Sequence, residues 1–201
     1  MEPAVEAAAP DANPVEKADI QAGVKLARWR DSRWVKAAAK AGDLGDQEPL
    51  YALTGAVLVF GLLRRDRRVA EAGARMLAAV AAADFAKSTI KSWVTRTRPH
   101  VLMDEQEYDS ELGGGDEKPR QSFPSGHAAG GAAVARALSR LYPQAGLAAG
   151  AGAAAMGVTR VAKGAHYPLD VVAGAVVGLA AEAAVDLAFR TGRAALSSSR
   201  R

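Results

Sequence analysis

Long apolar stretches without a charged side chain are the feature that most constrains how this chain can fold. The longest runs from Leu141 to Thr159, and two more run from Pro49 to Leu63 and from Phe123 to Val134. Two further stretches, Val69 to Trp93 and Pro168 to Phe189, are apolar in pattern but carry a few charges. None of them alternates apolar and polar residues as a half-buried strand does. We therefore expect an all-α fold, a bundle of five core helices at about residues 49–63, 69–95, 125–140, 144–160 and 168–189.

Composition supports close packing between helices. Apolar residues make up 49% of the chain but aromatic residues only 5%, so alanine and glycine carry much of the apolar content. Small side chains let helix backbones approach one another, whereas a β-sandwich needs β-branched and aromatic residues. The formal charge of +4 comes without a basic stripe interleaved with aromatic residues, so no nucleic-acid partner is expected. Cysteine is absent, which excludes disulfides and thiolate–metal sites.

The ends of the chain differ from this core. Residues 1–16 are rich in alanine, proline and acids and lack the basic start and apolar run of a secretory signal, so we expect a disordered tail. Residues 17–48 mix apolar and basic side chains at helical spacing. This amphipathic N-terminal segment fits a helix on an anionic membrane surface, and equally an amphipathic helix packed on the core. Residues 49–190 are expected to be the helical domain, and residues 191–201 a basic tail.

Arginines cluster between the apolar stretches in a way that indicates a membrane topology. If the helices run alternately up and down, one end of the bundle collects Arg64, Arg65, Arg67, Arg68, Arg136, Arg140, Arg190, Arg193, Arg200 and Arg201. The positive-inside rule makes that end cytoplasmic and the opposite end exofacial. Soluble helices also end in arginine, because cations favour helix C-termini. We expect a membrane-embedded bundle, although a span needs roughly 20 apolar residues and only Leu141–Thr159 approaches this without a charge.

Three polar clusters fall at the opposite helix ends, where an up-and-down bundle brings them to one face. They are Lys91…Arg98-Pro99, Pro124-Ser125-Gly126-His127 and Thr159-Arg160…His166…Asp170. Lys91, Arg98 and Arg160 offer cationic donors for phosphoryl oxygens, and arginine presents a planar fork to such an anion. Backbone N–H groups after Ser125 can meet the same anion at a helix start, where Gly126 has no Cβ to obstruct the approach.

Two of the three histidines lie in these clusters. Phosphoryl transfer requires a nucleophile and a proton donor in line on opposite sides of phosphorus. Asp170 follows His166 by one helical turn, so its carboxylate can hold the imidazole in one tautomer and activate it as the nucleophile. His127 is then left as the general acid for the leaving oxygen and as the base for the hydrolytic water.

Together the clusters resemble the three signature motifs of the type 2 phosphatidic acid phosphatase superfamily, which includes the vanadium haloperoxidases. The motifs are Lys-x6-Arg-Pro, Pro-Ser-Gly-His and Ser-Arg-x5-His-x3-Asp, and this chain has them in that order and spacing between Lys91 and Asp170. The one departure is Thr159, which keeps the hydroxyl of the usual serine. The resemblance implies a helical phosphatase domain, hydrolysis through a phosphohistidine, and no metal or other cofactor.

Length and the absence of a signal peptide point to one branch of that superfamily. Its secreted acid phosphatases carry a signal peptide, and its haloperoxidases are much longer than 201 residues. We therefore expect the membrane lipid-phosphatase branch, acting on a lipid phosphate or diphosphate of the phosphatidic acid or prenyl diphosphate type. The expected location is a bacterial-type inner or plasma membrane with an exofacial site. A soluble or peripheral broad-specificity acid phosphatase and a non-catalytic helical membrane module are the alternatives, and the oligomeric state stays open.

An acidic segment separates the first two clusters. Seven acids fall within the fourteen positions from Asp104 to Glu117. Their spacing fits no EF-hand, so we expect a solvated loop over residues 103–121, with a lid over the site as the functional alternative. A metallophosphatase would need several carboxylates near histidine, and the clusters supply only Asp170, so no metal site is predicted.

Overall fold

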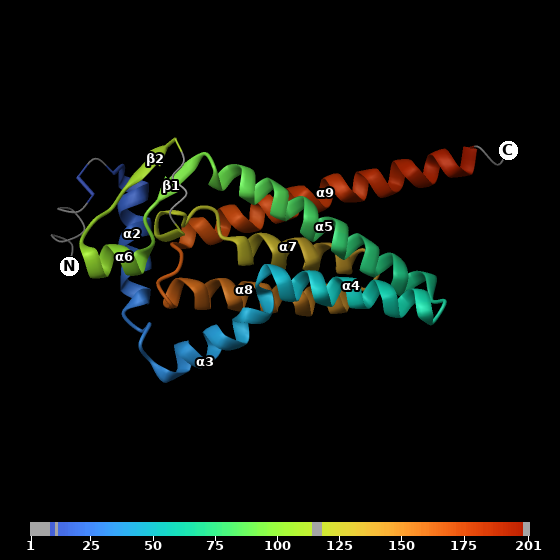
Figure 1. The fold of residues 1–201 in the computed structure, drawn as a ribbon, viewed down its shortest axis with the longest axis horizontal. Coiled ribbons are helices and arrows are strands. Elements are labelled where there is room, and N and C mark those ends of the chain that lie inside the picture. The colour runs from blue at the N-terminus through green and yellow to red at the C-terminus, as the bar shows by residue number, and fades with distance from the viewer. Residues whose placement is uncertain (1–8, 11, 114–117, 199–201) are drawn as a thin grey trace.

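Five long helices form an elongated bundle in the computed structural model, which describes residues 9–10, 12–113 and 118–198 (Figure 1). They are α4 (Gln47–Leu63), α5 (Arg67–Lys91), α7 (Gly126–Ser139), α8 (Pro143–Ala162) and α9 (Pro168–Ser198). Helix α7 packs against α5, α8 and α9, and α4 lies along α5. Leu50, Met76 and Val134 belong to the apolar core between these helices. The prediction of an all-α bundle with five core helices is confirmed.

A small region of strand and short helix joins α5 to α7 and was not expected. Helix α5 ends at Lys91, and β1 (Val94–Arg96) pairs antiparallel with β2 (Ser110–Leu112). Helix α6 (Pro99–Glu105) lies between the strands, and the short helix η2 (Lys118–Arg120) follows them. Strands of three residues are too short to show an alternating pattern in the sequence. Part of the predicted acidic loop, residues 114–117, lies outside the described residues.

The N-terminal segment is helical, and its two helices differ in how they use their apolar side chains. It forms α2 (Pro14–Ala27), α3 (Arg33–Gly42) and the short helix η1 (Asp43–Gly45). Helix α2 buries Ile20 and Val24 in a cluster with Tyr167, so this helix packs on the protein. Helix α3 exposes Trp34, whose accessible fraction is 71%. Residues 1–8 and 11 of the predicted tail lie outside the described part of the chain, and its last residues, 14–16, begin α2.

Two glycines let α9 lie directly against the start of α7. A Cβ atom at Gly174 would collide with the carbonyl oxygen of Ser125, and one at Gly178 with that of Ala129. Small residues four positions apart allow such close helix crossings. The backbone N–H of Ser125 donates to the carbonyl oxygen of Asp170 over 2.9 Å. The starts of α7 and α9 are therefore held in one fixed arrangement.

Charged residues are also buried between α5, α7 and α9, toward the other end of the bundle. Arg140 Nε lies 2.9 Å from Glu182 Oε1, and Arg75 Nη1 lies 2.8 Å from Asp186 Oδ1. A buried charge is tolerated where an opposite charge and hydrogen bonds satisfy it. This pairing explains why Glu182 and Asp186 are found in the otherwise apolar middle of α9.

Removing one of these acids should destabilise the bundle. Asp186→Ala leaves the Arg75 guanidinium, only 6% exposed, without its partner on α9. We expect a loss of about 3–5 kcal/mol in the free energy of unfolding, seen as a lower thermal unfolding midpoint of the purified protein. The control Asp31→Ala removes a carboxylate that is 79% exposed and should leave the midpoint unchanged. Equal midpoints in the two variants would contradict a structural role for the buried pair.

Candidate active site

All the residues predicted to form the site lie at the end of the bundle where the β1–β2 pair, α2 and α6 are found (Figure 1). They are Lys91, Arg98, Ser125, Gly126, His127, Arg160, His166 and Asp170. Lys91 ends α5, Arg98 precedes α6, and Arg160 lies in the last turn of α8. The Ser125 side chain caps α7 by accepting a hydrogen bond from the N–H of Ala128. Helix ends and loops thus supply every member of the site.

The three cations of the site are partly or fully buried beside one another. Lys91 Nζ and Arg98 Nη2 both donate to the carbonyl oxygen of Gln121, over 2.6 and 3.5 Å. Burial lowers the pKa of Arg98, and the nearby Arg160 guanidinium lowers it further, while Asp170 opposes both effects. Arg160 is 6% exposed, and its Nε atom has no hydrogen-bond partner among the described residues. Buried positive charge with an unpaired donor is an arrangement that favours binding of an anion.

The His166 side chain is buried, with 4% of the residue exposed, and one of its ring nitrogens makes a hydrogen bond. Its Nδ1 lies 2.8 Å from the carbonyl oxygen of Ser122. A carbonyl oxygen can only accept, so Nδ1 carries the proton and Nε2 keeps its lone pair. Burial lowers the pKa of His166 below its ordinary value, although Asp170 opposes this. Burial thus favours the neutral imidazole, the form that can act as a nucleophile.

Asp170 acts on His166 less directly than the sequence suggested. Its Oδ2 atom is 3.8 Å from Nδ1 of His166, beyond hydrogen-bond length. The carboxylate instead accepts from Arg96 Nη1 at 2.6 Å, from the Ser122 hydroxyl, and from the N–H of Tyr167 at 2.8 Å. Asp170 thereby fixes Ser122, whose carbonyl oxygen sets the tautomer of His166.

Arg96 was not identified from the sequence, and it is central to this network. It is buried between two carboxylates, with Nη1 on Asp170 and Nη2 2.7 Å from Asp19 Oδ2. Burial alone would lower the pKa of Arg96, but Asp170, Tyr108 and Asp19 together outweigh it and the pKa is raised. Asp19 also accepts a hydrogen bond from the N–H of Leu169 over 2.8 Å. The only signal in the sequence was that Arg96 fills one of the six unspecified positions of the first motif.

Two further carboxylates lie on the predicted phosphate site, and neither was identified from the sequence. Asp43 Oδ1 is 3.1 Å from Arg160 Nη2, and Asp46 Oδ1 is 2.6 Å from His127 Nε2. The contact between Asp46 and His127 lacks the alignment of a hydrogen bond. Both residues come from the η1 turn and the start of α4. The N-terminal segment therefore contributes charge to the site.

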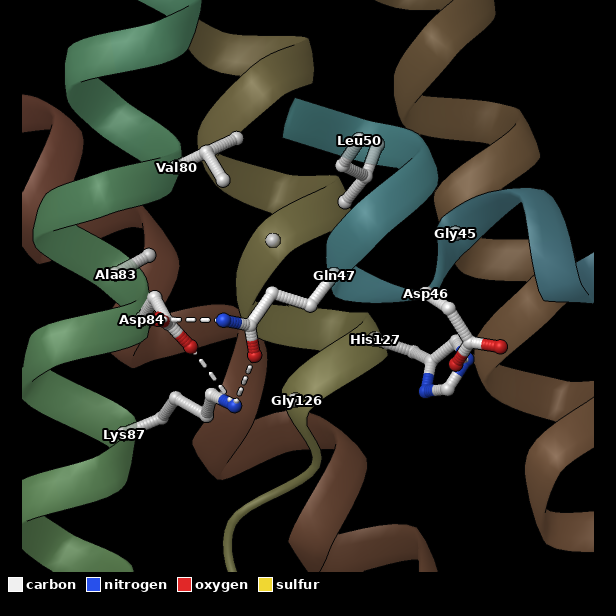
Figure 2. Close-up of a pocket in the computed structure, with 11 residues that line it drawn as sticks. Gly45, Asp46, Gln47, Leu50, Val80, Ala83, Asp84, Lys87, Gly126 and His127 are labelled. Atoms are coloured by element: carbon white, nitrogen blue, oxygen red, sulfur yellow. Dashed lines mark hydrogen bonds and ion pairs between the residues drawn. The ribbon is translucent and has the colours of Figure 1, made fainter. Parts of the chain in front are cut away.

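A cavity of about 180 Å³ opens beside His127, between the starts of α4 and α7 and the middle of α5 (Figure 2). Leu50, Val80 and Ala83 line one part of it. The opposite part is polar: Gln47 Nε2 donates to Asp84 over 2.8 Å, and Lys87 Nζ lies 2.9 Å from Asp84 and 3.2 Å from Gln47 Oε1. Figure 2 shows these three side chains joined in one network next to Gly126.

The acidic segment is partly paired with arginine in the described residues. Asp104 bonds to Arg30 over 2.5 Å, and Asp109 lies 3.5 Å from Arg120. Within the described part of the chain, no three histidine, aspartate or glutamate side chains are grouped so that they could hold a metal ion.

Comparison with known proteins places this geometry in a family. The model of the PAP2 superfamily matches residues 72–191. The lipid A 1-phosphatases of Rhizobium etli and Rhizobium johnstonii are both 47% identical to this chain over 58 residues, 29% of its length. That segment spans only 25% and 24% of those relatives, respectively.

A solved structure extends the likeness to nearly the whole fold. The transmembrane PAP2-type phosphatidylglycerolphosphate phosphatase from Bacillus subtilis superimposes with a TM-score of 0.62. It is 23% identical, and the match covers 94% of this chain and 92% of that one. The family match includes all three motifs and most of the bundle, and the resemblance inferred from the motifs is confirmed. This chain belongs to the PAP2 superfamily.

Proposed function

We propose that this protein is a lipid phosphatase in which Nε2 of His166 attacks phosphorus. The observation that carries the proposal is the buried His166, with its Nδ1 bonded to Ser122 and with Arg98 and Lys91 nearby. Attack forms a P–N bond while the bond from phosphorus to the leaving oxygen breaks, and His127 gives that oxygen a proton. Water then attacks phosphorus and His127 takes its proton, while the P–N bond breaks and returns its electron pair to Nε2 of His166, so that inorganic phosphate is released.

The cations stabilise the charge that builds on the equatorial phosphoryl oxygens during both steps. Arg160 has an unpaired Nε, and the start of α7 directs backbone N–H groups toward the same region. No residue grouping for a metal is found in the described chain, and the proposed chemistry draws its positive charge from side chains alone.

Apolar surface supports a lipid substrate and a membrane location. An apolar groove of about 800 Å³ runs along α7, α8 and α9 and reaches Ala128 and Pro168, next to the site. Helices α8 and α9 are each long and apolar enough to cross a membrane, over Pro143–Ala162 and Pro168–Ala195. Large apolar side chains stay exposed on them, among them Leu147, Val158, Val172, Val176 and Leu187. Exposed apolar surface on this scale marks contact with lipid or with another protein.

The names of the relatives agree with a lipid phosphate as the substrate. The curated relatives are named lipid A 1-phosphatases, and the solved one a phosphatidylglycerolphosphate phosphatase. A soluble phosphomonoester would leave the apolar groove without a function. We therefore place the lipid moiety of the substrate along that groove and its phosphate between the cations.

Replacing the nucleophile should abolish turnover. His166→Ala removes the proposed nucleophile, so we expect no phosphate release from phosphatidic acid, assayed with EDTA present. Labelled phosphate should be trapped on the wild-type protein in an acid quench and not on the variant. The control is His100→Gln, because the His100 imidazole bonds the carbonyl oxygen of Gly164 over 2.9 Å and has no place in the mechanism. Full activity in His166→Ala would refute the mechanism.

Replacing the guanidinium of the third motif should weaken phosphoryl binding without removing its charge. Arg160→Lys should lower kcat/KM by roughly 10- to 1,000-fold, because an ammonium cannot reproduce the bidentate fork. The matched control Arg136→Lys, at the other end of α7 and 50% exposed, should retain wild-type kinetics. Wild-type kinetics in Arg160→Lys would mean that this guanidinium does not bind the transferred group.

The proposed site should face outward from the cell. The arginines of the α4–α5 turn and of the end of α7 lie opposite the site, and the positive-inside rule makes them cytoplasmic. A cysteine at Glu111, exposed in β2, should react with an impermeant maleimide in intact cells, and one at Ser198 should not. The chain has no cysteine of its own to interfere. The opposite labelling would invert the topology, and recovery in a high-salt soluble fraction would remove the membrane from the proposal.

A further inference from the structure

Asp46 occupies the N-cap position of α4 but does not cap the helix. Its backbone is extended, with φ −64° and ψ 159°, as an N-cap residue requires, yet its side chain accepts no hydrogen bond from the first turn. Aspartate at this position normally bonds the N–H of the second or third helical residue. The carboxylate instead turns to His127, with Oδ1 2.6 Å from Nε2 (Figure 2). The Asp46 side chain therefore contacts His127 of the proposed active site and leaves the first turn of α4 without a side-chain cap.

The turn that carries Asp46 is anchored on both sides. Gly45 approaches α8 so closely that a Cβ there would collide with the Met156 thioether, and it would lie 3.6 Å from Cδ2 of His127. On the other side, Gln47 bonds Asp84 of α5 and accepts from Lys87. Asp46 therefore lies between two fixed neighbours, and its carboxylate cannot be an accidental contact of a loose loop.

His127 faces charged groups of η1, the start of α4, α8 and the loop before α9. Burial disfavours a positive imidazole most and lowers the pKa of His127 to about 4. Arg160 of α8 acts in the same direction, and so does His166 when it is charged, whereas Asp46 and Asp43 favour the positive form. A general acid must carry its proton before the leaving group departs, so the balance among these groups decides how well His127 performs.

We propose that Asp46 is a positioning residue that orients His127 through Nε2 and stabilises its protonated form. Nδ1 is then the nitrogen that gives its proton to the leaving oxygen, and Asp46 itself exchanges no proton. The contact is not yet aligned as a hydrogen bond, as is common for catalytic contacts before substrate binds. This inference rests on the proposed phosphatase function, and it assigns a part of the site to the N-terminal segment.

The test compares two leaving groups. Asp46→Asn should lower kcat on a lipid phosphate, whose alkoxide needs protonation, by about 10- to 100-fold. It should change kcat on p-nitrophenyl phosphate by less than about twofold, because that leaving group needs little protonation. The alkaline limb of kcat against pH should move to lower pH on the lipid substrate, since the imidazolium has lost its counter-charge. Asparagine is also a good N-cap, so α4 should not be weakened.

Three further variants define the expected pattern. His127→Ala should show the same leaving-group selectivity, and Asp46→Asn added to it should cause no further loss. Asp43→Asn should raise KM for both substrates, because its partner is Arg160. Asp31→Asn, an exposed carboxylate paired with Lys36, should behave as wild type. Asp46→Ser, which removes the charge but keeps a cap-forming side chain, repeats the test if Asp46→Asn is unstable.

Any other result contradicts either the role of Asp46 or the proposed phosphatase function. An unchanged kcat, or an equal loss on both substrates, overturns the role of Asp46. A higher rate in Asp46→Asn also overturns it, because the carboxylate would then be competing with phosphate for Arg160 and His127. If wild type is active and only the Asp46 pattern fails, the proposed function stands. A wild type inactive on every phosphate ester removes both proposals.

Discussion

The guanidinium of Arg96, buried between Asp19 and Asp170, is the interaction on which the functional end of this protein depends. It joins three parts of the chain: α2, β1 and the first turn of α9. Each partner would be costly to bury alone, and each is satisfied by additional hydrogen bonds, from Leu169 to Asp19 and from Ser122 and Tyr167 to Asp170. The position of Ser122 follows, and with it the orientation of His166.

The rest of the bundle holds that end in place by close helix packing and by a second group of charges. Gly174 and Gly178 bring α9 against the first turns of α7, so the helix start near His127 and the one near Asp170 cannot shift independently. A second set of buried charges, around Glu182 and Asp186, ties α9 to α5 and α7 farther along the bundle. Between the two sets lie mainly small apolar residues, which let the helices pack closely.

Sequence reasoning reached the helices and the motif residues because both leave local patterns. A run such as Leu141–Thr159 identifies a helix by itself, and α8 covers all of it except the first two residues. The motifs place Arg160 and His166 by spacing alone. Arg96 and Asp19 leave no such pattern, because they are 77 residues apart and only the tertiary fold brings them together. The roles of His166, His127 and the cations stay predictions until they are tested by substitution.

Asp46 shows a different limit of sequence reasoning. An aspartate just before an apolar helix predicts an N-cap, and Asp46 does stand at that position in the backbone. The sequence could not show that the carboxylate is used elsewhere, because the alternative partner is His127 on another helix. The β1–β2 pair was missed for a simpler reason: its strands contain three residues each.

The contacts of Asp19, Asp43 and Asp46 determine how short a fragment of this chain can be while its candidate active site stays intact. The segment recognised by the family model begins at residue 72, after all three carboxylates. A fragment trimmed to the conserved motifs would keep both histidines but would expose Arg96 and leave His127 and Arg160 without the counter-charges seen here. Helices α2 and α3 are thus part of the working unit, and any boundary drawn for truncation or fusion belongs before Asn13, whose side chain caps α2.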